Sequence, residues 1–306
     1  MYGPKYKEII VDICNKNQLK YKLYDDDLIM LNYNGKKKYI WSRRFPNNNN
    51  SACRIIDSKS LCSTVLSDNN IPVVTHIKLC RPNIEKYDLQ IKSNYKVCID
   101  LLNQYGKVVI KPDNSCEGTN VYFCQTEKEI ETALEKVFIN YKFAATSMFI
   151  NIVNEYRVFY LDGEILYIYK KERPYVIGDG KSTLVELLVN ARISKIDFKN
   201  ILLPLDFVPK KDEKCVLSMK HNLSQGGIAK PIKSSNLIET LSKIAVSAGN
   251  AVDANFVTVD IIEDDKHQLK VLEINSGVAM DQFILQHIDG YNIAYKIYEN
   301  AIKKLY

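Results

Sequence analysis

Lys111 and the loop behind it are the first place where this sequence offers side chains for chemistry. Lys111 ends a short apolar run and precedes Pro112. A lysine that closes a buried strand is unfavourable unless its ammonium group meets an anion. The polar loop 113–120 follows at once with Ser115 and Gly118, and its backbone N–H groups could close over phosphate oxygens. An equally acceptable interpretation is a lysine whose stem is buried while its ammonium group reaches water.

Two apolar segments further along the chain carry oxygen-bearing side chains. In VLEIN, the period of two in a strand places Glu273 and Asn275 on one face, and in VTVDII the residue Asp260 interrupts an otherwise apolar strand. If the two strands pair as a hairpin, the three side chains converge. Such ligands suit Mg²⁺ that is held jointly by protein and by substrate phosphates. The alternative is a polar stripe facing solvent, although acidic residues are rare inside apolar strands.

The segment HNLSQGG is a third candidate. Asn222 and Ser224 offer side-chain donors, and Gly226 and Gly227 permit a tight turn whose backbone N–H groups could bind a carboxylate or an oxyanion. An ordinary Gly-Gly turn explains the same letters. His221, which opens the segment, has no evident acid–base partner in the sequence.

The segment VIGDGKST ends in the letters of a phosphate-binding P-loop. That motif requires a glycine five residues before its Gly-Lys-Ser, and the glycine is missing here because Tyr175 precedes the segment. Thr183 and Glu186 instead have the spacing of a helix capping box. We therefore predict a tight turn followed by an amphipathic helix and no phosphate loop.

Composition narrows the class of protein. The chain has 306 residues, of which 46% are hydrophobic and 25% are charged, as in an ordinary globular protein. The net charge of +6 would suit an anionic ligand, or it reflects a general richness in lysine. No compact basic run resembles a nucleic-acid footprint, and no apolar stretch is long enough to span a membrane, so neither partner is expected. The eight cysteines are scattered, which favours reduced thiols in a cytoplasmic setting.

Turn and cap signals predict the arrangement of the elements. The Asn-Gly pair at 34–35 and the Asp-Gly pair at 162–163 each separate two apolar runs, as in two-residue β-hairpins. Thr126 and Glu129 form a second capping box. Strands and helices alternate without a regular βαβ repeat, so we expect an α+β fold rich in hairpins.

In their order, these segments resemble the ATP-grasp carboxylate–amine ligases, and among them the branch of cyanophycin synthetase and the ligase half of bifunctional glutathione synthetases. The resemblance is carried by DSK, VVIKP with its loop, EYRVFYLDGEI, ERPYVIGDGKSTLVELL, NLSQGG and VDII with VLEIN, which together run over residues 57–280. No single one of these motifs is decisive, but six of them in this order argue against a chance match.

The resemblance implies an ATP-grasp fold, in which two α+β subdomains grip ATP beside a small N-terminal α/β unit. The corresponding divisions are an N-terminal unit at 1–78, a small lid subdomain at 79–148 and a C-terminal subdomain with the metal site at 149–306. The expected partners are a small-molecule carboxylate and an amine, such as amino acids or peptides. A homodimer is the assembly we would expect first.

The resemblance also assigns the nucleotide site. Lys59 and Lys111 are expected to contact the phosphates, and the loop 113–120 is expected to close over them. Relatives commonly carry a glutamate in the strand that corresponds to MFINIV, where this chain has Asn151 as a substitute. The loop has Asn120 where relatives carry a second glycine, and asparagine tolerates the left-handed conformation that such a position requires.

By the same resemblance, Asp260, Glu273 and Asn275 are expected to hold two Mg²⁺ ions, for which Mn²⁺ could substitute. Arg157 and Arg173 are expected near the transferred phosphate or the substrate carboxylate.

The resemblance implies that a substrate carboxylate attacks the γ-phosphate of ATP and that an amine then displaces phosphate to leave an amide. The turn containing Asn222, Gly226 and Gly227 is expected to stabilise the acyl-phosphate. Phosphoryl transfer of this kind depends on positioning and charge neutralisation more than on a nucleophilic side chain. Two alternatives remain: an ATP-grasp kinase that acts on a hydroxyl group, and a nucleotide-binding regulatory protein with little turnover.

Overall fold

The computed structural model describes residues 5–25, 27–82, 94–115, 120–190 and 201–306. In these ranges the chain folds into antiparallel sheets with helices packed on them, which confirms the predicted α+β class. Within the described ranges, no helix combines the length and the apolar character that crossing a membrane would demand.

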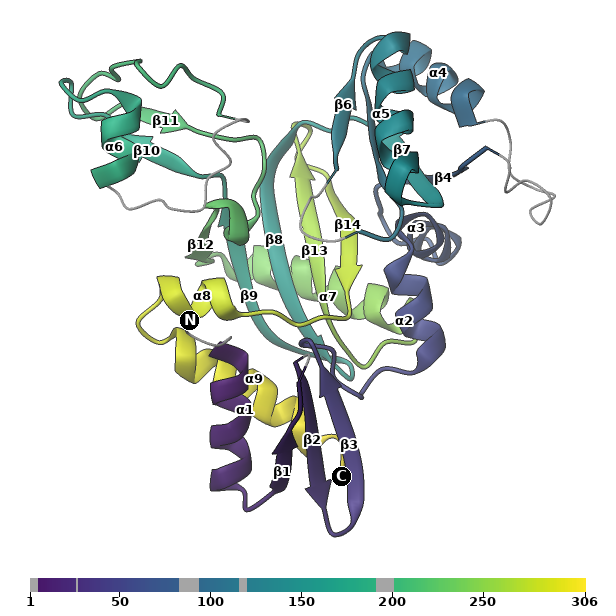
Figure 1. The fold of residues 1–306 in the computed structure, drawn as a ribbon, viewed down its shortest axis with the longest axis vertical. Helices are drawn as coiled ribbons and strands as arrows, with labels where there is room; N and C mark the ends of the chain where they lie inside the picture. Colours follow the sequence, from purple (N-terminus) through teal and green to yellow (C-terminus); the bar gives the residue numbers. More distant parts are fainter. Residues whose placement is uncertain (1–4, 26, 83–93, 116–119, 191–200) are drawn as a thin grey trace.

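The largest sheet has the strand order β12-β9-β8-β13-β14 and forms the centre of the molecule (Figure 1). Alternate residues of β8 and β13 face the helix α7 and the helices α2 and α3, where they form one apolar core. The opposite residues carry the charged groups described below. The elements are α2 (Asn50–Asp57), α3 (Lys59–Asp68), β8 (Ile152–Leu161), β9 (Glu164–Glu172), β12 (Ile228–Pro231), α7 (Ser235–Ala251), β13 (Phe256–Asp264) and β14 (Leu269–Asn275).

A smaller sheet of order β4-β7-β5-β6 stands beside the large one, and α4 and α5 cover its outer face (Figure 1). The predicted capping box begins α5: the Thr126 hydroxyl accepts from the backbone of Glu129, and the Glu129 carboxylate accepts from the backbone of Thr126. The elements are β4 (Ile77–Cys80), α4 (Asn94–Tyr105), β5 (Val108–Pro112), β6 (Tyr122–Cys124), α5 (Glu127–Asn140) and β7 (Phe143–Met148).

The described residues up to 41 form a helix and a three-stranded sheet, and this part of the N-terminal unit does not bury its core alone. Its apolar side chains join those of α8 and α9 in a single cluster. The predicted hairpin between β2 and β3 is confirmed, with Asn34 at φ 49° and Gly35 at φ 85°. The elements are α1 (Lys5–Lys16), β1 (Lys20–Leu23), β2 (Leu28–Tyr33), β3 (Lys36–Trp41), α8 (Asp281–Gln286) and α9 (Gly290–Lys303). Because the core is shared, the divisions at residues 78 and 148 remain a proposal about organisation.

The segment that resembles a P-loop forms a turn in a small module of β10 (Tyr175–Ile177), α6 (Leu184–Asn190) and β11 (Lys214–Val216). The Asp179 carboxylate accepts hydrogen bonds from the backbone N–H groups of Lys181 and Ser182 at 2.8 and 2.7 Å. These bonds, the one from the Ser182 backbone foremost, lower the pKa of Asp179 to about 2. The predicted capping contacts between Thr183 and Glu186 are also present. The N–H groups that a phosphate would need therefore already have an acceptor within the turn.

Candidate functional site

A cleft between the small sheet and the large sheet gathers six of the thirteen predicted site residues. Its lining includes Lys59, Lys111 and Ser115 from one side and Glu273, Arg173 and Asn222 from the other. It also includes apolar side chains of both sheets, among them Val109, Met148, Ile262 and Leu272. Residues that lie far apart in the sequence thus meet in one place, between two sheets that have separate cores.

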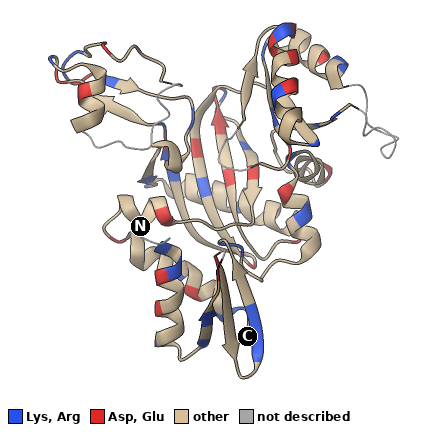
Figure 2. Cartoon of the chain, viewed as in Figure 1, with Lys and Arg blue, Asp and Glu red and all other residues tan. Residues whose placement is uncertain are grey.

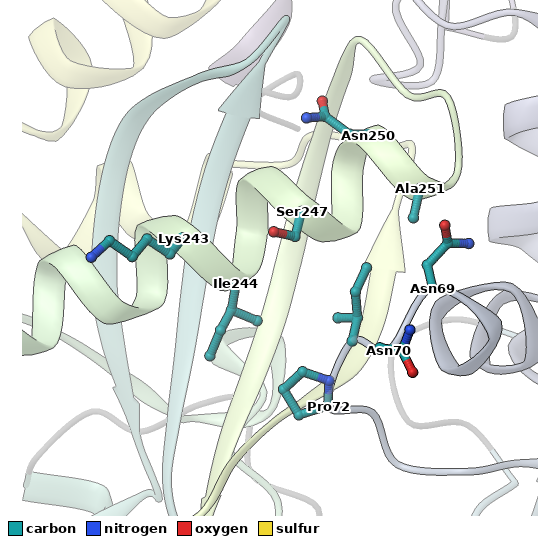
Figure 3. Close-up of a pocket in the computed structure, with 9 residues that line it drawn as sticks. Asn69, Asn70, Pro72, Lys243, Ile244, Ser247, Asn250 and Ala251 are labelled. Atoms are coloured by element: carbon teal, nitrogen blue, oxygen red, sulfur yellow. The ribbon is translucent and has the colours of Figure 1, made fainter.

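A second hollow lies outside this cleft, between α7 and the turn that follows α3 (Figure 3). It has a volume of about 450 Å³. Its lining, however, contains none of the predicted site residues. Its lysine, Lys243, is exposed and pairs with Glu239 at 2.6 Å on the same helix. We therefore place the functional site in the cleft.

Lys111 is the last residue but one of β5 and is 9% exposed, so the prediction of a lysine near the end of a buried strand is confirmed. Burial lowers the pKa of Lys111 to about 8, and Lys59 acts in the same direction, while Glu273 opposes the shift. Among the described residues, no carboxylate forms a salt bridge with its ammonium group. This cation is therefore held in a place that favours an incoming anion.

Lys59 opens α3 and is positioned by a set of hydrogen bonds to the start of the loop 113–120. Its backbone N–H donates to the carbonyl of Asp113 at 3.0 Å, and the Asp113 carboxylate accepts from Ser60 N–H at 2.8 Å. The ammonium group of Lys59 contacts the carbonyl oxygen of Ser115. The loop therefore starts beside both lysines.

Of the rest of that loop, Asn120 has the left-handed backbone expected for it, at φ 54°. Gly118 lies outside the described residues.

The strands β13 and β14 pair antiparallel, as predicted, with Asp260 opposite Glu273 and Thr258 opposite Asn275. The amide of Asn275 donates to the Glu273 carboxylate at 3.3 Å. Glu273 lines the cleft. The hairpin therefore brings the three oxygen-bearing residues to adjacent positions of one sheet.

Asp260 is almost completely buried and is bound by two cations. It accepts from Nε and Nη2 of Arg157 at 2.8 and 2.6 Å, and Lys171 Nζ lies 2.8 Å from its second oxygen. Burial alone would raise the pKa of Asp260, but Arg157 and Lys171 outweigh it and hold that pKa below its usual range. Figure 2 shows basic and acidic segments side by side across this sheet. Arg157, which the resemblance places near the transferred phosphate or the substrate carboxylate, binds Asp260 in the structure.

Lys171 connects this pair to a third carboxylate. It is 1% exposed and lies 2.5 Å from Glu155, directly opposite it on β9. His221 Nδ1 lies 3.4 Å from the same carboxylate. Burial lowers the pKa of His221 to about 3, with Arg173 and Lys171 adding to the effect, so the ring is neutral at pH 7. The expectation that His221 has no acid–base partner was wrong, because folding brings Glu155 to it from β8.

The donors on the hairpin fit a metal ion that shares its ligands with a substrate. In the described part of the chain, no three His, Cys, Asp or Glu side chains form a cluster that could hold a metal by themselves. The carboxylate of Asp260 already accepts from two cations, which leaves Glu273 with Asn275 as the oxygen donors beside the cleft. Mg²⁺ commonly binds one or two carboxylates and completes its shell with water and phosphate oxygens.

Arg173 follows β9 and lines the cleft, where its Nη2 donates to the carbonyl of Ile152 at 2.7 Å. Its Nε is buried and has no hydrogen-bond partner among the described residues. Burial lowers the pKa of Arg173, yet a guanidinium remains charged in proteins. Asn151 is exposed between β7 and β8, and its neighbours Ile150 and Ile152 line the cleft in its place.

The turn at 222–227 differs from the predicted anion nest. The N–H groups of Gln225 and Gly227 both donate to the carbonyl of Asn222 at 3.0 Å, and that of Gly226 donates to Leu223 at 3.3 Å. A side chain at Gly227 would lie 2.4 Å from the carbonyl of His221, so the close turn requires glycine there. The backbone donors are therefore used inside the turn, and what the turn brings to the cleft is Asn222.

Residues 217–301, which include the turn and both strands of the predicted metal site, match the family model of the RimK-like ATP-grasp domain. This part of the chain is therefore similar to the RimK-like ATP-grasp domain. The ATP-grasp family implies ATP and Mg²⁺ as ligands, and the match does not give the number of ions.

Relatives of known name support this assignment at low identity. The chain is 24% identical over 248 residues to the glutathione biosynthesis bifunctional protein of Clostridium perfringens, which covers 73% of this chain and 30% of that protein. It is also 24% identical over 246 residues to the tetrahydromethanopterin:alpha-L-glutamate ligase of Methanocaldococcus jannaschii, with coverage of 80% and 66%. The chain thus spans less than a third of the first relative and about two thirds of the second.

Solved structures show the same fold. A bifunctional glutathione synthetase from Pasteurella multocida superposes with a TM-score of 0.60 at 19% identity, over 97% of this chain and 44% of that one. A D-alanine–D-alanine ligase from Bacillus anthracis gives 0.56 at 18% identity, over 84% and 69%. The fold prediction is confirmed by these likenesses, which at such identity concern the fold alone.

Proposed function

We propose that this chain is an ATP-dependent carboxylate–amine ligase that forms an amide through an acyl-phosphate. The observation that carries the proposal is the cleft, in which two buried or half-buried lysines on one side face a carboxylate and an arginine on the other. A nucleotide triphosphate with Mg²⁺ matches both sides, because its phosphates suit the lysines and its metal suits Glu273 with Asn275.

In this proposal Lys59 and Lys111 neutralise the phosphates of ATP, and the loop that begins at Asp113 covers them. Mg²⁺, when bound with ATP, supplies charge neutralisation between the phosphates. Whether one or two ions bind is part of the proposal, since Asp260 can join a second site only by loosening a contact with Arg157 or Lys171.

Arg173 and Asn222 line the same cleft and are proposed to orient the reacting carboxylate. A carboxylate oxygen attacks the γ-phosphorus, and ADP leaves with the electrons of the broken P–O bond. The amine then attacks the acyl carbon, loses a proton and displaces inorganic phosphate. His221 is neutral and next to Glu155, so this pair is proposed to hold the position of the turn beside the reacting groups.

Names of relatives indicate the substrate class. Proteins similar to this chain make glutathione, attach glutamate to a pterin or join two D-alanine residues. In each case the printed name describes the joining or use of amino acids. We propose an amino acid or a small peptide for at least one of the two substrates.

Release of phosphate from Mg²⁺·ATP tests the proposal when it is measured against pools of amino acids and dipeptides, with products weighed by mass spectrometry. A ligase forms ADP only when both an acid and an amine are present, and its product has the combined mass less one water. Glu273→Gln and Lys111→Ala should strongly reduce both signals.

The alternatives give different results. A kinase would add the mass of a phosphoryl group to a hydroxyl compound, without requiring an amine. A nucleotide-binding regulatory protein would bind ATP and release no phosphate with any pool, which would contradict the proposal.

A further inference from the structure

His76 is a buried side chain of the cleft that the proposed reaction has not used. It precedes β4, is 4% exposed and lines the cleft with Lys59 and Lys111. Its backbone N–H donates to the hydroxyl of Ser63 at 3.1 Å, and that hydroxyl in turn donates to the carbonyl of Ser60 at 2.9 Å. The backbone at His76 is therefore held at the wall of the cleft, and the imidazole ring takes no part in this hydrogen bond.

Neither ring nitrogen of His76 forms a hydrogen bond of normal geometry among the described residues, although both are buried and the Val74 carbonyl is near enough to raise the pKa of the ring. A buried polar atom without a partner is unfavourable, and an apolar ring of the same shape would avoid that cost. A histidine at this place is explained if a bound molecule supplies the missing partner.

The groups around His76 indicate the charge of that molecule. Lys111 approaches from β5 and Lys59 from α3, while the carboxylates of Glu273 and Glu155 line the same cleft from the large sheet. Burial, then Lys111, then Lys59 hold the pKa of His76 well below its usual range, and only the carbonyl of Val74 opposes them. The ring is therefore neutral in the free protein, with one N–H donor and one acceptor.

We propose that His76 donates a hydrogen bond to a phosphate oxygen of the bound nucleotide and so forms a third member of the phosphate site with Lys59 and Lys111. This inference rests on the proposed function, because it takes the ligand to be a nucleotide. A phosphate at this point satisfies the ring and offsets the two lysine charges. It thereby favours protonation of the ring, so that nucleotide binding takes up a proton.

Two variants separate a phosphate contact from a structural role. His76→Phe keeps a flat ring and removes both nitrogens, and His76→Gln keeps an amide donor. We expect the affinity for ATP and ADP with Mg²⁺, measured by calorimetric titration, to fall at least about tenfold in His76→Phe and less in His76→Gln. The affinity for adenosine should stay the same in all three proteins. The melting temperature of nucleotide-free His76→Phe should equal or exceed that of the wild type.

Proton uptake gives a second readout. Titrations at pH 6.5 in two buffers of different ionisation enthalpy should show uptake on ATP binding by the wild type and none by His76→Phe. Lys111, with a pKa of about 8, is already charged at that pH and does not supply the signal.

The outcomes distinguish this inference from the proposed function. If the wild type binds no nucleotide, both are overturned. If nucleotides bind and both variants match the wild type in affinity and proton uptake, His76 has no contact with phosphate and the ligase proposal stands. Equal losses for adenosine and ATP, or a lower melting temperature of free His76→Phe, would make His76 a nucleoside contact or a support of the fold and would overturn the inference.

Discussion

Both sheets that face the cleft bury titratable side chains. Those on the large sheet are paired with one another, and within the described ranges those on the small-sheet side are not. On the large sheet, Asp260 pairs with Arg157 and Lys171, and Lys171 also pairs with Glu155. On the other side, Lys111 and His76 are buried to a similar degree without an ion-pair partner among the described residues. One set is satisfied within the protein, and the other set is not.

The difference separates stability from binding. A closed network of buried charges becomes strongly unfavourable when one member is lost, because its partners remain buried and unpaired. Buried cations without partners instead destabilise the free protein and gain their partners from a ligand. Variants on the large sheet should therefore reduce stability, and variants on the opposite side should reduce affinity for a nucleotide.

The largest loss of stability should come from removing Asp260 from the ion-pair network that it forms with Arg157, Lys171 and Glu155. Asp260→Leu leaves the cations of Arg157 and Lys171 with only Glu155 to share, so we expect the free energy of unfolding to fall by about 3–5 kcal/mol. Urea denaturation followed by circular dichroism measures it. The matched control is Glu273→Gln on the facing strand, whose carboxylate has no salt bridge among the described residues and which should cost less than about 1 kcal/mol. Equal losses of unfolding free energy in the two variants would contradict the difference proposed between paired and unpaired buried charges.

Glu273→Gln should instead affect the reaction. Removing a carboxylate that holds the metal costs on the order of 3 kcal/mol of transition-state stabilisation, so phosphate release should fall about 100-fold. Steady-state rates at saturating Mg²⁺ and ATP check this. Asn275→Asp keeps an oxygen donor on the same strand and should retain most of the rate. A Glu273→Gln protein within a few-fold of the wild type would remove the metal from this hairpin.

Lys111→Met tests the other side of the cleft. We expect the affinity for ATP to fall roughly 10- to 100-fold, since a charge-assisted hydrogen bond contributes about 1.5–3 kcal/mol. The unfolding free energy should be unchanged or higher, because a buried charge is removed. Its counterpart in the network, Lys171→Met, should lose about 3 kcal/mol of stability. If Lys111→Met is the less stable of the two, the contrast between the sheets is wrong.

The smallest effect concerns pH. The free protein loses the charge of Lys111 above a pKa of about 8, whereas bound phosphate holds the proton on. The apparent dissociation constant of ATP should therefore rise by up to about tenfold per pH unit above pH 8. The unfolded chain binds more protons than the folded one between pH 8 and about 10.4, so the contribution of Lys111 to stability rises over that range. Lys111→Arg should flatten the binding profile, and an equal slope in that variant would assign the effect to another group.

Local signals in the sequence predicted much of this architecture. Two-residue turns and capping boxes depend on residues that are close in the chain, so the hairpins at 34–35 and 162–163 and the start of α5 were correct. The period of the strands predicted the shared face of Glu273 and Asn275, and the hypothesis that their strand pairs with that of Asp260 is confirmed. These features need no knowledge of distant contacts.

Lys171 was missed because a bulge changes the register of its hairpin. Counting from the Asp-Gly turn pairs Tyr160 with Ile165, and the same count would place Lys170 opposite Glu155. The structure instead shifts by one residue after Tyr160, so that Lys171 pairs with Glu155. A shift of one residue moves every later side chain to the other face of the strand. No sequence signal for this bulge was evident.

The histidines were missed for a different reason. The surroundings of the His76 and His221 rings depend on burial and on charged residues from other elements. Lys111 on β5 lies near His76, and Glu155 on β8 lies near His221. The turn at 222–227 shows the same limit, since its glycines were identified but the use of their N–H groups within the turn was not. Long-range packing decides these features.

The central claim is that the cleft transfers the γ-phosphoryl group of ATP to a carboxylate. Its most direct test is to supply amino-acid and dipeptide pools with ¹⁸O in their carboxylates and to weigh the inorganic phosphate released from Mg²⁺·ATP. An acyl-phosphate passes one carboxylate oxygen to phosphate, so the account predicts ¹⁸O-labelled phosphate that disappears in Glu273→Gln. Unlabelled phosphate released at the full rate would mean that water or another acceptor attacks ATP, and would contradict it.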